Sequence, residues 1–274
     1  MTTRTLPPGT AGDRLPYPAA GTLDVWTLNT AQLLTLGAAE HVLDAEERRR
    51  AAALRRPIDR SQYVAAHLGL RTLLSWYLGM APGKVVLRRE PCPLCGGPHG
   101  RPAVTADPAL HYSLSHTDDL VLYGLATTAV GVDVESTASP TVAADVTPHL
   151  HFDEQAEINQ LPPSQRPGAF TRCWVRKEAY LKGTGTGLGV SPDSVYLGTQ
   201  STPRLHHPLH PAPVGWTVMD LDARNNYHAA AAVAHTTSGH ASLFPVHRRR
   251  LGQQAVKACT TPSLALSRVR ASGG

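Results

Sequence analysis

Apolar residues along this chain change from helical to extended spacing twice, once in each half. Between Asp59 and Leu78 the apolar positions recur every three or four residues, which predicts an amphipathic helix. From Leu110 onward they alternate with polar residues, which predicts strands, and a predicted helix from Gln165 to Lys182 precedes a second set of strands. Helices mixed with a few strands in both halves are typical of an α+β fold built as two similar lobes.

The predicted boundaries follow these changes in pattern. Residues 1–22 are rich in proline and glycine and are expected to form a flexible lead-in. Residues 23–129 are expected to form an N-terminal lobe and residues 130–244 a C-terminal lobe. Residues 245–274 are expected to be a basic, disordered tail.

The charge of the chain is concentrated at its end. The net charge is +5, and residues 246–274 carry six basic residues and no acid, which leaves −1 for the rest. Because a near-neutral body offers no broad basic surface to a phosphate backbone, nucleic acid is not an expected partner. A binding module, in which the tail holds nucleic acid or an acidic partner and the body is a scaffold, remains an alternative.

Three absences bear on where the protein works. No stretch approaches the roughly 18 to 20 apolar residues that span a bilayer, so no membrane association is expected. The first thirty residues lack the basic start and apolar block of a secretory signal. The four cysteines are too scattered for a disulfide framework, so the expected location is the cytoplasm.

The segment from Gly131 to Glu135 reads Gly-Val-Asp-Val-Glu. In a strand, Val132 and Val134 would face one side, and Asp133 and Glu135 the other. Two carboxylates on one face repel each other unless a cation lies between them, and Mg²⁺ prefers such oxygen ligands. The same alternation also fits a solvent-exposed strand face, so the fragment alone leaves both interpretations open.

A second segment, from Trp174 to Lys182, lies in the predicted helix. Trp174, Glu178 and Lys182 share one helix face because they are four residues apart. Glu178 and Lys182 alone would fit an ordinary helix ion pair. Lys177 beside Glu178 is unusual because only four of the 26 basic residues are lysine.

Together with a Ser-His pair that could bind an anion, these segments resemble the 4′-phosphopantetheinyl transferase superfamily, in particular its larger, surfactin-synthetase-activating type. That family is marked by S-H, G-x-D-x-E and W-x-x-K-E-x-x-x-K. Those motifs stand here in order at Ser115–His116, Gly131–Glu135 and Trp174–Lys182, with 43 residues between Glu135 and Glu178. Gly100-Arg101-Pro102 matches the family's glycine–basic–proline turn, and the resemblance spans roughly residues 23–235.

The resemblance implies a monomer of two pseudo-symmetric α+β lobes, with the active site and coenzyme A in the cleft between them. The enzyme would move the phosphopantetheine arm of coenzyme A to a serine of an acyl or peptidyl carrier protein and release adenosine 3′,5′-bisphosphate. Asp133, Glu135 and Glu178 would hold Mg²⁺. Glu178 would also accept the serine proton, and Lys182 would stabilise charge on the transferred phosphate.

The resemblance also implies a set of residues that bind coenzyme A. His116, with Ser115, matches the family residues at the 3′-phosphate, and Lys182 would face the transferred phosphate. Lys177 would contact either the same region or only the neighbouring acids. Further expected contacts are Arg56, Arg60 and Arg101. Two-metal nucleases and polymerases use similar acids, but they need a basic groove that a body with a net charge of −1 does not supply.

Two features lie outside these motifs. Cys92, Cys95 and His99 form half of a zinc-site pattern, but no second C-x-x-C or histidine pair follows at zinc-knuckle spacing. The favoured interpretation is a loop with reduced thiols. Gly183 follows the lysine-bearing segment and is expected to end that helix.

Overall fold

The computed structural model describes residues 14–31, 33, 41–200, 206–207, 210–211, 214–224, 226–235 and 245–260 of the 274 residues. In this part the chain mixes helices with β-sheets, which confirms the predicted α+β class. Within the same residues, no helix combines the length and the apolar character that crossing a lipid bilayer requires.

Two sheets form the centre of the molecule. The larger has the strand order β11–β1–β5–β4–β3–β2 and is antiparallel except where β11 runs parallel to β1. Its strands are β1 (Leu23–Asn29), β2 (Leu87–Arg89), β3 (Pro102–Val104), β4 (His111–Thr117), β5 (Leu120–Ala126) and β11 (Val246–Arg250). The smaller sheet is antiparallel, in the order β6 (Val130–Ser136), β10 (Tyr227–Ala234), β9 (Trp216–Leu221). A separate short pair joins β7 (His206–His207) and β8 (His210–Pro211).

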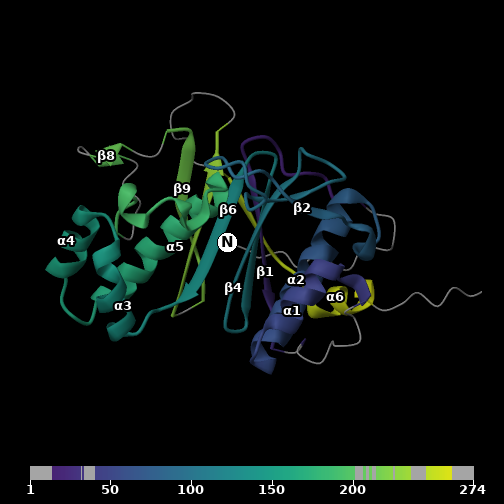
Figure 1. Ribbon diagram of the computed structural model, residues 1–274, viewed down its shortest axis with the longest axis horizontal. Coiled ribbons are helices and arrows are strands. Elements are labelled where there is room, and N and C mark those ends of the chain that lie inside the picture. The colour runs from purple at the N-terminus through teal and green to yellow at the C-terminus, as the bar shows by residue number, and fades with distance from the viewer. Residues whose placement is uncertain are drawn as a thin grey trace, which may run out of the picture.

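The helices cover the outer faces of these sheets (Figure 1). On one side lie α1 (Ala45–Ala53), α2 (Pro57–Leu78) and α6 (Gln253–Thr260), and on the other α3 (Pro140–Val146), α4 (Phe152–Gln160) and α5 (Arg166–Thr184). Short 3₁₀ helices occupy residues 82–84, 147–149, 187–189 and 192–194. Buried aliphatic side chains from both sheets form a common core between them. The chain therefore stacks in four layers, helix, sheet, sheet and helix.

Local signals set the helix boundaries. Asp44 and Glu47 form a capping box at the start of α1, since each side chain accepts a hydrogen bond from the other's backbone nitrogen. The prediction that Gly183 ends α5 is wrong, because the helix continues to Thr184 and is capped by Gly185, which adopts a left-handed φ of +78°. Gly183 lies inside the helix, where it packs against Gly131 of β6.

The lead-in predicted for residues 1–22 is wrong for residues 14–22, which pack on the body of the molecule. Arg14 Nε donates to the carbonyl oxygen of Tyr77 at 2.7 Å, and the Leu15 backbone nitrogen donates to that of Trp76 at 2.9 Å. Both contacts satisfy carbonyls near the end of α2 that the helix itself leaves unpaired. Residues 1–13 lie outside the described residues.

The disordered tail predicted for residues 245–274 is wrong for residues 245–260, which form β11 and α6. Arg249 lies over the Trp26 ring, 5.3 Å from its centroid, and 3.6 Å from the buried carboxylate of Asp24. Leu251 and Val256 are buried in the core of the larger sheet. A basic segment is ordered here because it meets an acid and an aromatic ring on β1. Residues 261–274 lie outside the described residues.

The strands of the larger sheet come from residues 23–129 except for β11, and those of the smaller sheet come from residues 130–244. The predicted division into two lobes at residues 129 and 130 stays a prediction. One element crosses it, because β11 returns from the end of the chain to pair with β1.

Candidate active site

Asp133 is a buried carboxylate at which three elements meet. It lies on β6 and is 2% exposed. Its Oδ1 accepts hydrogen bonds from the Ser115 hydroxyl of β4 at 2.7 Å and from Lys182 Nζ of α5 at 2.6 Å. Lys182 Nζ also donates to Ser115 Oγ at 3.1 Å. The structure thus brings together the Ser-His, G-x-D-x-E and W-x-x-K-E-x-x-x-K segments, which lie far apart in the sequence.

The second carboxylate oxygen of Asp133 lacks the hydrogen bonds that the first one accepts. Asp133 Oδ2 is buried and has no hydrogen-bond partner among the described residues. Buried acceptors of this kind are uncommon in folded proteins, and a buried carboxylate in particular needs paired charge. An oxygen donor that is buried, charged and without a partner fits a site for a hard cation such as Mg²⁺.

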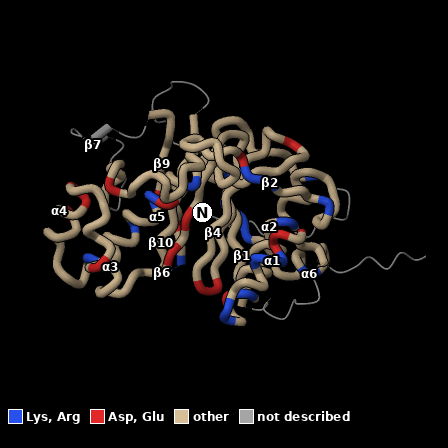
Figure 2. Tube along the Cα trace, in the orientation of Figure 1, with Lys and Arg blue, Asp and Glu red and all other residues tan. Residues whose placement is uncertain are grey.

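A close contact between backbones places α5 against β6. Gly131, Asp133 and Glu135 alternate onto the face of β6 that points toward α5. A Cβ at Gly131 would overlap the carbonyl oxygen of Ala179 and the backbone nitrogen of Gly183. The G-x-D-x-E motif begins with glycine because α5 occupies the space that a side chain at Gly131 would need. The acidic residues of β6 and the charged residues of α5 are adjacent near the centre of the molecule (Figure 2).

Glu135 and Glu178 extend the acidic cluster. Burial, together with the negative charges of Asp133 and Glu178, raises the pKa of Glu135 to about 7 against the opposing effects of Thr117 and Lys182. Burial also raises the pKa of Glu178, which the Lys182 ammonium opposes and the charge of Asp133 reinforces. Glu135 and Glu178 are therefore both close enough to Asp133 for its charge to raise their pKa values.

The three carboxylates do not yet form a coordination shell. Within the described residues, no three of their ligand oxygens lie within 4.8 Å of one another. Glu135 and Glu178 are only partly buried, so their side chains can turn. The donor set fits Mg²⁺ in chemistry and charge, and coordination by all three requires Glu135 or Glu178 to rotate toward Asp133.

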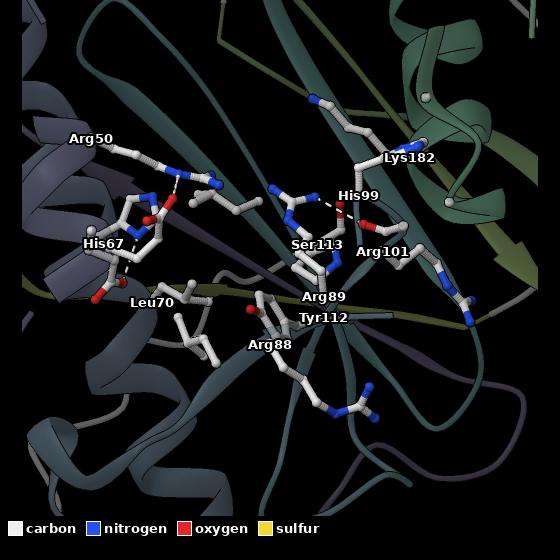
Figure 3. A pocket seen from close by; sticks show the side chains of 18 of the residues that line it. Arg50, His67, Leu70, Arg88, Arg89, His99, Arg101, Tyr112, Ser113 and Lys182 are labelled. Atoms are coloured by element: carbon white, nitrogen blue, oxygen red, sulfur yellow. Dashed lines mark hydrogen bonds and ion pairs between the residues drawn. The ribbon is translucent and has the colours of Figure 1, made fainter. Parts of the chain in front are cut away.

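A cavity of about 610 Å³ opens beside this cluster, a volume typical of sites for cofactor-sized ligands. Arg50 and His67 lie on one side of it, and Lys182 and Arg101 on the other (Figure 3). Five basic side chains line the cavity, namely Arg50, Arg88, Arg89, Arg101 and Lys182, against three acidic ones, Asp44, Glu46 and Glu47, so positive charge is in excess. Such a lining suits a ligand with several negative charges.

The other sequence-predicted residues are distributed unevenly around this cavity. Arg101 lines it and donates to the Glu90 carboxylate at 2.7 Å and to the Gly183 carbonyl at 3.3 Å. His116 lies exposed on β4, where partial desolvation and the charges of His67 and Lys182 lower its pKa. Arg56 and Arg60 lie exposed at the start of α2 and do not line the cavity.

The expectation that Lys177 contacts coenzyme A is corrected by the structure. Lys177 is 1% exposed, and its Nζ lies 2.7 Å from Glu154 Oε2 of α4. It also donates to the carbonyl oxygens of Pro192, at 2.7 Å, and Val195. All three donors of the ammonium are used inside the protein, so Lys177 joins α5 to α4 and to residues 192–195.

Replacing Lys177 with methionine is expected to lower the free energy of unfolding by about 3 to 5 kcal/mol, because Glu154 would remain buried without its cation. Chemical denaturation measures this change. Lys84→Met, at an exposed lysine, is the control and should stay within about 0.5 kcal/mol of wild type. A loss of coenzyme A affinity in folded Lys177→Met, with stability unchanged, would restore the original expectation.

His67, which no sequence motif indicated, lines the cavity from α2. His67 Nδ1 lies 2.8 Å from Glu47 Oε1, and its ring stacks on Tyr63 with the centroids 4.1 Å apart. Arg71 Nε donates to the same Glu47 carboxylate at 2.7 Å. Tyr63, His67 and Arg71 are spaced four residues apart, so a polar stripe on α2 was the available signal.

An acidic strand, a lysine-bearing helix and a cavity with an excess of basic side chains are together suited to a phosphorylated substrate. Comparison with known proteins agrees. Residues 129–232 match the model of the 4′-phosphopantetheinyl transferase superfamily. The 4′-phosphopantetheinyl transferase HetI of a Nostoc species is 30% identical over 197 residues, which cover 70% of this chain and 78% of that protein.

Two further relatives cover smaller shares. The 4′-phosphopantetheinyl transferase psf-1 of Bacillus pumilus is 30% identical over 45% of this chain and 54% of its own length. A phosphopantetheinyl transferase of a Thraustochytrium species is 31% identical over 63% of each chain. The chain thus spans less than two thirds of these two relatives.

The protein belongs to the 4′-phosphopantetheinyl transferase superfamily, which confirms the resemblance drawn from its motifs. It is therefore a transferase.

Proposed function

We propose that this enzyme transfers the 4′-phosphopantetheine arm of coenzyme A to a serine of an acyl or peptidyl carrier protein, with Mg²⁺, and releases adenosine 3′,5′-bisphosphate. The observation that carries the proposal is the convergence of Ser115, Asp133 and Lys182 beside a cavity lined by basic residues. Coenzyme A carries a pyrophosphate and a 3′-phosphate, which such a lining would accommodate.

The proposed arrangement treats the two helix–sheet pairs as pseudo-symmetric lobes, with coenzyme A in the cleft between them. Arg101 and Lys182 supply positive charge on one side of the cavity. His116, and Arg56 and Arg60 at the start of α2, are proposed contacts for the 3′-phosphate and the other phosphates. We expect the enzyme to act as a monomer in the cytoplasm.

The proposed role of Ser115 differs from the one that the resemblance implies. Its hydroxyl donates to Asp133 Oδ1 and accepts from Lys182 Nζ. Because the single O–H donor of this hydroxyl is already used on Asp133, it has none left for a phosphate oxygen. Ser115 is therefore proposed to orient Asp133 and Lys182, and His116 to contact coenzyme A.

Asp133, Glu135 and Glu178 are the proposed magnesium ligands, and the bound ion would supply positive charge against the pyrophosphate. Glu178 is also proposed to accept the proton of the carrier serine, directly or through a water molecule, with a carboxylate that the bound ion would keep ionised. The serine oxygen bonds to the phosphorus next to the pantetheine arm, and the bond to the bridging oxygen breaks. Lys182 stabilises the negative charge that develops on this phosphate.

The proposal is tested by mixing the purified protein with coenzyme A, Mg²⁺ and several apo-carrier proteins. Intact-mass spectrometry is expected to detect one phosphopantetheine arm on one serine of at least one carrier. A carrier with that serine replaced by alanine is the control and should gain no mass. If the folded enzyme modifies none of the carriers, while a second transferase modifies them under the same conditions, the proposed function is wrong.

A further inference from the structure

The loop between β2 and β3 gathers three residues that neither the motifs nor the proposed mechanism use. Cys92 and Cys95 offer sulfur atoms and His99 a ring nitrogen, and these ligand atoms all lie within 4.8 Å of one another. Cys95 Sγ lies 3.0 Å from His99 Nε2. In the described part of the chain, no other three His, Cys, Asp or Glu residues come this close.

Backbone hydrogen bonds within the loop hold these three residues close together. The Gly96 nitrogen donates to the Cys92 carbonyl at 2.8 Å, and the Cys92 nitrogen donates to the Gly97 carbonyl at 2.7 Å. Gly96 has a left-handed φ of +72°, a conformation that glycine adopts readily. The backbone N–H groups of Leu94 and Cys95 point at Cys92 Sγ and lower the pKa of its thiol. These contacts form a tight turn around the first sulfur.

Gly97 leaves room for the other two ligands. A Cβ at this position would lie 3.1 Å from the His99 ring and 3.3 Å from Cys95 Sγ. Glycine therefore lets the histidine fold back over the turn and meet the second cysteine. At the base of the loop, the Glu90 nitrogen donates to the Arg101 carbonyl at 2.9 Å and the Gly100 nitrogen donates to the Glu90 carbonyl at 3.0 Å. Backbone hydrogen bonds thus hold the loop both around Cys92 and at its base, where Glu90 pairs with Gly100 and Arg101.

We propose that Cys92, Cys95 and His99 bind one Zn²⁺ ion through Cys92 Sγ, Cys95 Sγ and His99 Nε2. Two thiolates and one imidazole favour Zn²⁺ over Mg²⁺, because Mg²⁺ binds mainly oxygen ligands. Zn²⁺ is usually four-coordinate, and the fourth position is open to water because Cys95 and His99 are exposed. Reduced thiols, which the sequence alone favours, and a Cys92–Cys95 disulfide are the competing states. Neither of these two states accounts for the position of His99 beside Cys95 Sγ.

The ion would stiffen one wall of the cavity beside the proposed active site. His99, Gly100 and Arg101 line that cavity, and the Arg101 guanidinium connects Glu90 to the end of α5. A metal on the preceding residues would close the loop and limit the motion of this wall. The inference concerns loop structure and does not depend on the proposed transfer reaction.

The test uses the full chain, reduced and stripped of metal with a chelator. Native mass spectrometry with added Zn²⁺ is expected to detect one ion per chain, and Co²⁺ is expected to give the absorption bands of thiolate coordination. Cys95→Ser and His99→Ala are each expected to weaken Zn²⁺ binding by at least about a hundredfold, since even outer-sphere changes cost 10- to 100-fold. Cys259→Ser and His149→Ala are matched controls away from the loop and should bind as wild type does.

A second readout is independent of catalysis. Zn²⁺ is expected to raise the unfolding temperature of the wild-type chain and of both controls, but not of Cys95→Ser or His99→Ala. The proposal fails if the reduced chain binds no Zn²⁺, or if all the variants bind it equally. It also fails if intact mass under the same reducing conditions reveals a Cys92–Cys95 disulfide that excludes the ion.

Discussion

Replacement of Asp133 by asparagine is expected to lower phosphopantetheine transfer by at least about a thousandfold while coenzyme A still binds. Asparagine keeps an oxygen that accepts the Ser115 hydrogen bond, but it removes the charge that pairs with Lys182. It also removes one of the negative ligands proposed for Mg²⁺. A thousandfold loss is about 4 kcal/mol, which is within the several kcal/mol that charge stabilisation by a metal contributes.

Three measurements together test this expectation. Initial rates come from the intact mass of the carrier protein, and calorimetry measures coenzyme A affinity with and without Mg²⁺. Thermal unfolding establishes that the variant is folded. Asp145→Asn, at an exposed acid on α3, is the matched control and should retain the wild-type rate. A folded Asp133→Asn enzyme with a rate within tenfold of wild type would rule out the proposed role of this acid.

Much of the active site was predictable because its signals are local. The alternation in Gly131–Glu135 predicted the strand, and the four-residue spacing of Glu178 and Lys182 predicted their shared helix face. The structure places both segments in the expected elements, β6 and α5. The contact between Gly131 and Gly183 was not predictable, because the sequence does not state which helix will lie against which strand.

The error at Lys177 has a geometric cause. Successive residues of an α-helix are about 100° apart around its axis, so Lys177 cannot share the face of its neighbour Glu178. The motif places the two side by side in the sequence, and the helix separates them in space. Lys177 faces Glu154 instead, an acid on α4 that no local pattern links to it. Helix geometry applied strictly would have excluded Lys177 from the site, although it would not have found its partner.

The error at the chain end has a different cause. Counting charges treats each arginine of residues 248–250 as a solvated group. Arg248 instead lies 2.5 Å from Asp222, and Arg249 lies near Asp24, which is 1% exposed. A buried acid on β1 and a basic segment more than 200 residues later form one structure. Pairings across that distance leave no periodic trace in a single sequence.

Deletion of residues 245–274 is therefore expected to unfold the protein, whereas deletion of residues 261–274 is expected to leave it folded. The longer deletion removes β11 and with it the edge partner of β1. It also removes His247, whose Nδ1 lies 3.0 Å from Asp24, and Arg249, whose guanidinium lies 3.6 Å from the same carboxylate. A buried acid that loses its cation costs about 3 to 5 kcal/mol.

The apolar contribution of the same segment is comparable. Leu251 and Val256 are 1% and 0% exposed, and each fully buried side chain of this kind contributes about 1.5 to 3 kcal/mol. Added to the cost at Asp24, this approaches the entire stability of a typical domain, about 5 to 15 kcal/mol. Circular dichroism and thermal unfolding of the two truncated chains measure the difference.

A point substitution separates the core contribution from the effect of truncation itself. Leu251→Ala in the full chain is expected to lower the free energy of unfolding by about 3 kcal/mol, the usual cost of such a cavity. If the longer deletion folds and unfolds at the wild-type temperature, β11 and α6 are dispensable and the tail is an appendage after all. The binding-module alternative expects nucleic-acid binding to be lost when residues 245–274 are deleted. That loss supports the alternative only if the shortened chain still folds, because an unfolded body would also fail to bind.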